Sequence, residues 1–232
     1  MTTAYRLAVL ASGRGSNLQA IFDAIADGSL PAQVVGVFSD RADAYALERA
    51  RLAGVPATIV RPRDFSDRAV YDQALFAQVD ASKPDLIVCA GYMRLISAAA
   101  VQQRPGRMIN IHPSLLPAFK GLRTHEQALA AAVAEHGASV HFVTAELDGG
   151  PVIAQARVPV APGDDVAQLS ARVLAREHPL MIEVLRLMAA RRVRLEINGH
   201  ESIIHLDGQP LTAPLQLGQD NRLPWPAGPL PR

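Results

Sequence analysis

Short apolar runs alternate with longer segments of helical periodicity along most of this chain. Strand–helix–strand alternation is typical of a largely parallel sheet covered by helices on both faces. We therefore predict an α/β fold built on a Rossmann-like, mostly parallel twisted sheet. Strands are expected at 6–11, 33–39, 57–60, 85–90, 107–111, 138–144 and 152–160, and helices at 17–27, 43–53, 66–82, 124–135 and 165–190. Such sheets bind ligands beyond the carboxyl ends of their strands, so the loops that leave the strands are where chemistry is expected.

The composition narrows the classes of protein. The chain has 232 residues, of which 49% are hydrophobic, and a formal net charge of +1. This charge gives no electrostatic basis for binding nucleic acid. The apolar run 7–11 is too short for a signal peptide, and no stretch approaches the roughly 20 residues of a membrane helix. We expect a cytoplasmic monomer or homodimer with no nucleic-acid or membrane partner.

The chain is expected to form one domain over residues 1–207, followed by a proline-rich tail. Residues 208–232 show no helical or strand period, and we predict an extended or poorly ordered segment in which Trp225 could dock on the body or on a partner. The one cysteine, Cys89, excludes an internal disulfide and a multi-cysteine zinc site, and its apolar context indicates a core residue. The histidines show no ligand spacing, so no metal is expected.

The first unusual loop lies between a strand and a helix, where Ser12-Gly-Arg-Gly15-Ser16-Asn17 precedes Leu18. Glycines let backbone amides turn toward a ligand, and the amides at a helix start carry partial positive charge. A phosphate monoester is the expected guest, bound by Gly15, Ser16 and Asn17. The spacing matches neither a P-loop nor a dinucleotide fingerprint. A tight turn with a capped helix is the alternative.

The second loop follows a strand that carries Asn110 and His112. Residues two apart in a strand point to the same side, and Pro113 helps to end the strand directly after them. An amide donor and an imidazole are the groups that acyl transfer to an amine requires, for the oxyanion and for the proton. A histidine hydrogen-bonded within the core is the alternative. No serine or cysteine stands in a nucleophile-elbow context, which argues against a covalent acyl-enzyme.

The third loop contains a carboxylate in a glycine turn, Asp148-Gly-Gly-Pro151. Asp148 could simply form the turn through its own hydrogen bonds. Near His112 it would also hold the imidazole and favour its charged form. Glu146 is the competing carboxylate, and we choose Asp148 because the flanking glycines fix its backbone.

Together these loops resemble the folate-dependent phosphoribosylglycinamide formyltransferases. The resemblance runs from about residue 5 to 208 and rests on four stretches, 12–20, 85–94, 109–117 and 139–152. It implies the formyltransferase fold and the transfer of a formyl group from 10-formyltetrahydrofolate, as co-substrate, to the amine of glycinamide ribonucleotide, without a metal. The implied catalytic set is Asn110, His112 and Asp148.

The resemblance also implies ligand contacts at matching positions. Gly15, Ser16 and Asn17 would hold the substrate phosphate, and Glu177 would contact the glycinamide end. The implied folate-binding residues are Arg68, Met93, Arg94, Leu95, Ile96, Asn110, Thr144, Ala145, Glu146, Leu147 and Asp148. The chain departs from the family pattern at Ala145, where aspartate is usual, and at Arg123, Leu174, Met181 and Ile182.

Three alternative functions remain open at this point. A formyltetrahydrofolate hydrolase would be expected to carry an extra regulatory domain before residue 1. A methionyl-tRNA formyltransferase would need a basic second domain after about residue 200, where a proline-rich segment stands. A non-catalytic nucleotide-binding regulator would have no need for Asn110, His112 and Asp148.

Overall fold

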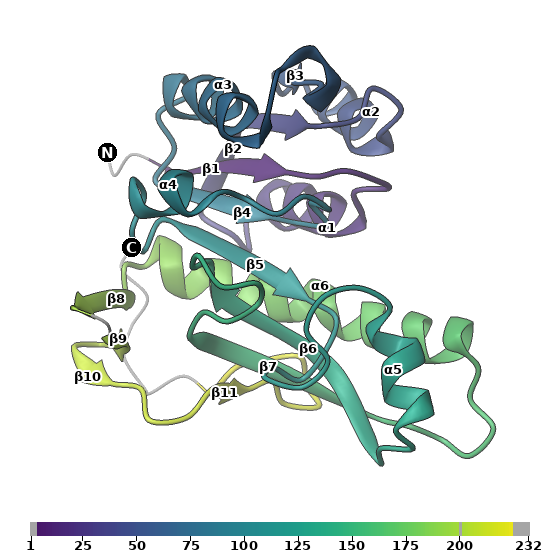
Figure 1. The fold of residues 1–232 in the computed structure, drawn as a ribbon. Helices are drawn as coiled ribbons and strands as arrows, with labels where there is room; N and C mark the ends of the chain where they lie inside the picture. The colour runs from purple at the N-terminus through teal and green to yellow at the C-terminus, as the bar shows by residue number, and fades with distance from the viewer. Residues whose placement is uncertain (1–3, 200, 225–232) are drawn as a thin grey trace. The chain divides into compact units, whose positions relative to one another are not determined.

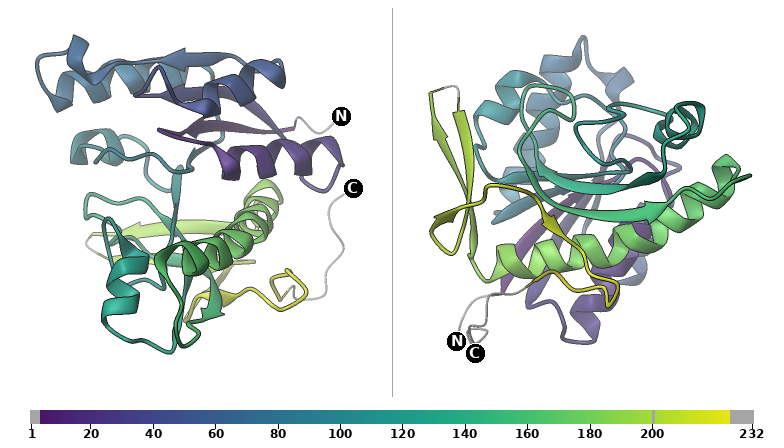
Figure 2. Two further views of the ribbon diagram at one scale, coloured as in Figure 1. Left: turned by 90° about the vertical axis from the view of Figure 1, so that its right-hand side faces the viewer. Right: turned by 90° about the horizontal axis from the view of Figure 1, so that it is seen from below.

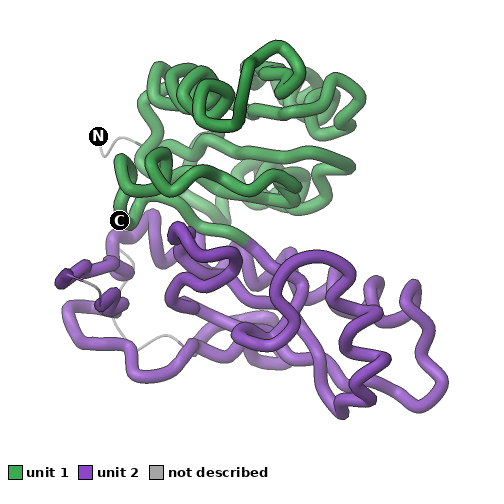
Figure 3. Tube along the Cα trace, in the orientation of Figure 1, with its two compact units in different colours: residues 1–110 green, residues 111–232 purple. Residues whose placement is uncertain are grey.

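The computed structural model describes residues 4–199 and 201–224. The chain divides into two compact units, residues 1–110 and residues 111–232, which Figure 3 colours separately. Trp225 and the residues after it lie outside the described residues.

Unit 1 is a parallel sheet with the strand order β3-β2-β1-β4-β5 (Figure 1). The chain builds outward from β1 to β3, then crosses to the other side of β1 and continues with β4 and β5. Right-handed crossovers place α1 and α2 on one face of the sheet and α3 and α4 on the other, and the two members of each pair are in contact. The elements are β1 (Tyr5–Leu10), α1 (Ser16–Ala26), β2 (Ala32–Ser39), α2 (Tyr45–Leu52), β3 (Ala57–Ile59), the 3-10 turn Pro62–Asp64, α3 (Arg68–Ala81), β4 (Leu86–Cys89), α4 (Ala98–Gln102) and β5 (Met108–His112).

The core of unit 1 is centred on β1, whose residues Leu7 to Leu10 are completely buried. A strand that is buried on both faces needs a continuous apolar run, which is how residues 7–11 read in the sequence. Cys89 is buried at the end of β4, as predicted, and burial raises the pKa of its thiol to about 12.

Unit 2 pairs β6 with β7 in antiparallel fashion, and β11 joins the other edge of β7 in parallel. The long helix α6 packs along both β6 and β7 (Figure 2), and a capping box between Asp165 and Gln168 begins it. A separate small sheet has the order β10-β9-β8. The elements are α5 (Thr124–Ala130), β6 (Glu135–Phe142), β7 (Val152–Pro159), α6 (Val166–Ala189), β8 (Val193–Asn198), β9 (Glu201–Leu206), β10 (Gln209–Pro210) and β11 (Leu215–Gln216).

The predicted α/β class with a mostly parallel sheet is confirmed. Several element boundaries were wrong, most of all the end of one helix. The helix expected over 124–135 ends at Ala130, because Ala132 turns the chain with a φ of 47° and β6 then begins at Glu135. Helix α4 and the four strands from β8 to β11 were not predicted from the sequence. The division into a domain over 1–207 and a tail over 208–232 stays a prediction, although β10 and β11 lie inside that tail.

Among the residues that the structure describes, no helix is both long enough and apolar enough to cross a membrane.

Candidate functional site

The strand order of unit 1 reverses between β1 and β4, and in open α/β sheets such a reversal is where ligands bind, beyond the carboxyl ends of the strands. Both loops were predicted to bind ligands. They are joined by two hydrogen bonds of Ser12, whose backbone N donates to Gly91 O over 3.0 Å and whose side-chain Oγ accepts from Met93 N over 2.9 Å. The predicted phosphate loop and the predicted folate segment 93–96 are therefore neighbours within unit 1.

The phosphate loop enters α1 through Gly15, which has a φ of 69°. A side chain at this position would put its Cβ 2.8 Å from the Cβ of Ala46, so Gly15 is required both by its conformation and by the approach of α2. No side chain caps α1 at Gly15. The amides of the first turn therefore have no side-chain acceptor at the cap, which is the arrangement of an anion site.

Arg94, in the segment after β4, lies over the ring of Tyr71 at 5.1 Å from its centroid. Tyr71 is also hydrogen-bonded to Tyr92, with 2.8 Å between the two hydroxyl oxygens. Arg68 is the first residue of α3, one turn before Tyr71, so the two predicted folate-binding arginines belong to one neighbourhood of unit 1. Met93 and Leu95 are exposed, whereas Ile96 is buried.

Asn110 and His112 are the third and last residues of β5. Their spacing directs both side chains to one face of the strand. Asn110 stands opposite Cys89 at the end of β4 and is half-buried. His112 belongs to unit 2, which begins at residue 111.

His112 is buried, and both of its ring nitrogens have acceptors within unit 2. Nε2 lies 2.9 Å from the carbonyl oxygen of Phe119, and because a carbonyl can only accept, Nε2 carries the proton. Nδ1 lies 3.4 Å from Oδ2 of Asp148. The charged imidazole would satisfy both contacts. A direct hydrogen bond from His112 to a substrate oxygen requires one of them to give way.

Asp148 lies in the turn between β6 and β7, with a φ of 46°. Its Oδ2 accepts a hydrogen bond from Gly121 N at 2.9 Å, and its Oδ1 lies 3.7 Å from Nε2 of His141. Burial by itself would raise the pKa of Asp148. The hydrogen bonds from His141 and Gly121, together with the two nearby imidazoles, lower the pKa below its ordinary value, so Asp148 is a carboxylate at neutral pH.

The pKa of His112 is lowered, mainly because the ring is buried, and the imidazole of His141 lowers it further. The Phe119 carbonyl and Asp148 raise it, but by less than burial lowers it. Asp148 therefore favours the charged imidazole, as expected, but burial lowers the pKa of His112 by more than Asp148 raises it. The neutral ring predominates at neutral pH and can accept a proton.

His141 and the loop over 113–123 are parts of this cluster that were not predicted from the sequence. His141 could have been found, since it is a histidine near the end of a strand that leads into the Asp148 loop. The Phe119 carbonyl and the Gly121 amide could not, because backbone groups have no residue-type signal.

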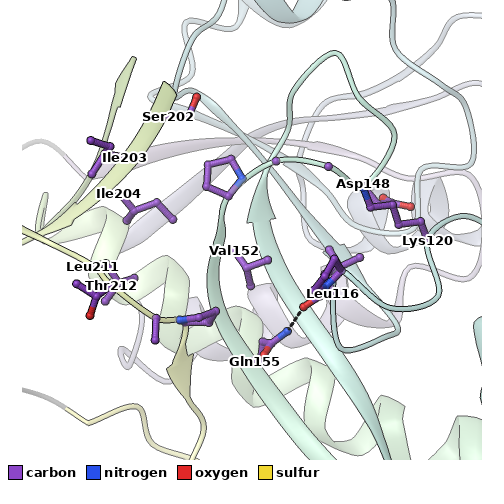
Figure 4. A pocket seen from close by; sticks show the side chains of 16 residues that line it. Leu116, Lys120, Asp148, Val152, Gln155, Ser202, Ile203, Ile204, Leu211 and Thr212 are labelled. Carbon is purple, nitrogen blue, oxygen red and sulfur yellow. Dashed lines mark hydrogen bonds between the residues drawn. The ribbon is translucent and has the colours of Figure 1, made fainter. Parts of the chain in front are cut away.

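A cavity of about 530 Å³ lies in unit 2 against the turn that carries Asp148 (Figure 4). One wall comes from Leu116, Lys120 and the turn 148–152, and the other from residues 202–204 and 211–214 of the small sheet and the segment after it. Gln155 lies at its base and donates to Leu116 O over 2.9 Å, drawn as a dashed line in Figure 4. Asp148 is the only predicted catalytic residue among those that line this cavity.

The remaining predicted residues of unit 2 lie on two elements. Thr144, Ala145, Glu146 and Leu147 belong to the loop after β6, and all but Thr144 are exposed. Glu177 is half-buried on α6, where Met181 is completely buried and Ile182 half-buried. Within residues 4–199 and 201–224, no group of three or more His, Cys, Asp or Glu side chains is placed to hold a metal ion.

Comparison with known proteins adds a family, two relatives and a solved structure that this chain resembles. The family described as "Formyl transferase" matches residues 5–185. The phosphoribosylglycinamide formyltransferase of Escherichia coli K12 is 48% identical over 205 residues, which cover 88% of this chain and 95% of that protein. The enzyme of the same name from Haemophilus influenzae is 40% identical over 206 residues, covering 89% and 95%. A solved structure of the Coxiella burnetii phosphoribosylglycinamide formyltransferase superposes with a TM-score of 0.85 and 47% identity, covering 90% of this chain and 97% of that one.

Proposed function

This chain belongs to the phosphoribosylglycinamide formyltransferases, and from that membership we propose that it transfers the formyl group of 10-formyltetrahydrofolate to the amine of N1-(5-phosphoribosyl)glycinamide. The products are the N-formyl ribonucleotide and tetrahydrofolate, in the synthesis of IMP. Both substrates are small molecules, and the proposed location is the cytoplasm.

The observation that carries the proposal is the contact between His112 and Asp148 in unit 2. His112 stands two residues after Asn110 in the same strand, β5. The amine nitrogen attacks the formyl carbon, and the carbonyl electrons move to oxygen. Asn110 and the protonated form of His112, which is the minor form at neutral pH, stabilise the oxyanion once one of the two contacts of the ring gives way. Asp148 supports the charge on His112 and relays the amine's proton through water. The intermediate then collapses, the bond to the folate nitrogen breaks, and that nitrogen is protonated.

The other proposed contacts follow the chemistry of the loops. The uncapped first turn of α1 suits a phosphate, so Gly15, Ser16 and Asn17 are proposed to hold that of the ribonucleotide. Segments 93–96 and 144–148, with Arg68, are proposed to bind the folate, and Glu177 the glycinamide end.

The test is spectrophotometric. Purified protein is mixed with 10-formyltetrahydrofolate, and deformylated folate is followed with and without glycinamide ribonucleotide. Release that depends on the ribonucleotide is the expected result. Equal release without it would mean a hydrolase, and no release in either case would favour the nucleotide-binding regulator.

A further inference from the structure

Two backbone groups from one exposed loop hold the side chains proposed to be catalytic in unit 2. The carbonyl of Phe119 accepts from His112 Nε2, and the amide of Gly121 donates to Asp148, each over 2.9 Å. A backbone group is only as well placed as the segment that carries it. The question is therefore what fixes residues 119–123.

The first half of the loop is fixed by hydrogen bonds to its surroundings. Leu116 N donates to Ser139 Oγ over 3.0 Å, and Ser114 Oγ donates to Ala118 O over 2.7 Å. In the second half, Gln127 Nε2 donates to Leu122 O over 2.8 Å and the ring of Phe119 meets that of His136 edge-on, yet the backbone adopts an unusual conformation. Residues 119, 121 and 123 have φ angles of 55°, 79° and 56°, and Leu122 is 72% exposed. Non-glycine residues persist in such conformations only where other contacts determine them.

Lys120 supplies a contact of this kind. Its Nζ lies 2.7 Å from Oε1 of Glu146, in the loop after β6. The carboxylate of Glu146 is in turn folded over its own turn, because a Cβ added at Gly149 would lie 2.3 Å from Glu146 Cδ. Gly149 N also donates to Glu146 O over 3.2 Å. Lys120 is thereby tied to the turn that carries Asp148, and Figure 4 draws both residues at the same edge of the cavity.

We infer that the Lys120–Glu146 ion pair positions the Phe119 carbonyl and the Gly121 amide against His112 and Asp148, and so sets the turnover rate. The inference rests on the proposed function and deepens it. Lys120 and Glu146 are positioning residues in this role, because they act through His112 and Asp148. The pair is largely exposed, with side-chain exposures of 35% for Lys120 and 69% for Glu146, and such pairs contribute little to global stability. Its effect is on geometry.

The experiment compares Lys120→Met, Glu146→Gln and the double variant with the wild type, once the wild type shows release that depends on the ribonucleotide. Absence of that release would count against the proposed function and not against the ion pair. We expect kcat to fall about 10- to 100-fold in each single variant, which is the effect of a small misplacement of catalytic groups. In Lys120→Met, KM for both substrates should stay within about twofold. Glu146 also lies in the proposed folate-binding segment 144–148, so Glu146→Gln is judged by kcat alone. The double variant should lose no more than either single one, because the two residues act as a unit.

Two further readouts separate positioning from a structural role. The Gly121 amide should exchange its hydrogen faster in Lys120→Met than in the wild type, while the midpoint of thermal unfolding is unchanged. Lys120→Arg should keep kcat within about threefold of the wild type, since it restores the charge.

The matched control is the Arg157–Glu135 pair, which is also exposed and joins β7 to the start of β6 over 2.9 Å. Arg157→Met and Glu135→Gln should leave kcat unchanged. Wild-type kcat in Lys120→Met would overturn the inference. In Lys120→Met, a raised KM for the folate with unchanged kcat would also overturn it, in favour of direct contact with that substrate, and so would global unfolding of the single variants.

Discussion

Asp148 has both an unusual backbone conformation and a carboxylate that contacts the proposed catalytic histidine. Its backbone has a φ of 46°, which aspartate and asparagine tolerate better than other residues with side chains. Its carboxylate contacts His112 and the Gly121 amide. Because asparagine keeps the conformation and removes the charge, Asp148→Asn separates the two features.

We expect Asp148→Asn and His112→Asn to lower kcat by about 10²- to 10⁴-fold, the usual size of a lost general acid–base group. Circular dichroism and the unfolding midpoint should show that both variants remain folded. The measurement is ribonucleotide-dependent release of deformylated folate. Near-wild-type turnover in both variants would exclude the proposed roles.

His136 makes stability depend on pH. It is completely buried in β6, with its Nε2 3.1 Å from Nδ1 of His125. Burial lowers its pKa to about 4, and the nearby His125 and His112 lower it as well. In the unfolded chain the ring binds a proton near pH 6.5, so the unfolded state gains protons first as the pH falls.

The free energy of unfolding should therefore fall between about pH 6.5 and pH 4, by up to about 3 kcal/mol from this residue alone. Urea unfolding at pH 7.5, 5.5 and 4.5 measures it. His136→Gln removes the titrating group and should show a shallower fall. Parallel curves for the two proteins would contradict the assignment.

The residues whose side chains carry chemistry were within reach of the sequence. Asn110 and His112 share a strand face by spacing, and Asp148 stands in a glycine turn. The way His112 is held was out of reach, because it depends on the main chain of residues 119–121 and on a tertiary contact with Asp148. The net direction of the His112 pKa shift was also out of reach, since it depends on burial.

At the scale of elements, the start of α1 depends on how closely α2 approaches it. Gly15→Ala combines an unfavourable φ of 69° with a Cβ 2.8 Å from Ala46. We expect the free energy of unfolding to fall by about 1–2 kcal/mol because of the unfavourable conformation. Overpacking against Ala46 should lower it by about 1–3 kcal/mol more, and KM for the ribonucleotide should rise.

Gly28→Ala is the control for this prediction. Gly28 follows α1 with a φ of 78°, but a Cβ there meets nothing within 4 Å. Only the conformational part of the loss should appear, with KM unchanged. Urea unfolding and initial rates measure the two effects. An equal fall in the free energy of unfolding of the two variants would show that the contact with Ala46 does not contribute.

The strands of the small sheet were not predicted, although the sequence carries turn signals for them. The β9–β10 hairpin turns at Asp207-Gly208, whose φ angles of 53° and 80° suit a tight hairpin turn. Gly199, with a φ of 63°, follows β8. Both glycines were visible signals beside alternating residues. The end of α5 was harder to foresee, because the alanines that follow Ala130 favour a helix. The start of β6 depends on the pairing of Glu135 with Pro159, which is distant in the sequence.

At the scale of the whole chain, segment 217–223 is held on α6 by buried and half-buried polar groups. Arg176 donates to Leu217 O and Gly218 O and is hydrogen-bonded to Asn221. Glu183, almost completely buried, accepts from Leu223 N and from Arg222, each over 3.1 Å.

Glu183→Gln should lower the free energy of unfolding by about 1–3 kcal/mol, because a buried charge-assisted contact is weakened. It should also speed proteolytic cleavage near residues 217–223. Glu48→Gln, in the exposed pair with Arg51, should change stability by less than about 0.5 kcal/mol. Urea unfolding with limited proteolysis tests both, and equal stability of the two variants would argue against this role of Glu183.

The pairing of β11 with β7 also bears on the order in which the molecule assembles. Leu215 pairs with Ala154, so this contact closes a long loop, whereas β1 and β2 pair across a single helix. Contacts that are distant in sequence form late, because their loop-closure entropy is lost before they are stabilised. Strand β11 has only two residues, and it would be among the last parts to dock during folding. Its amides would then be among the first to exchange by local opening in the native state.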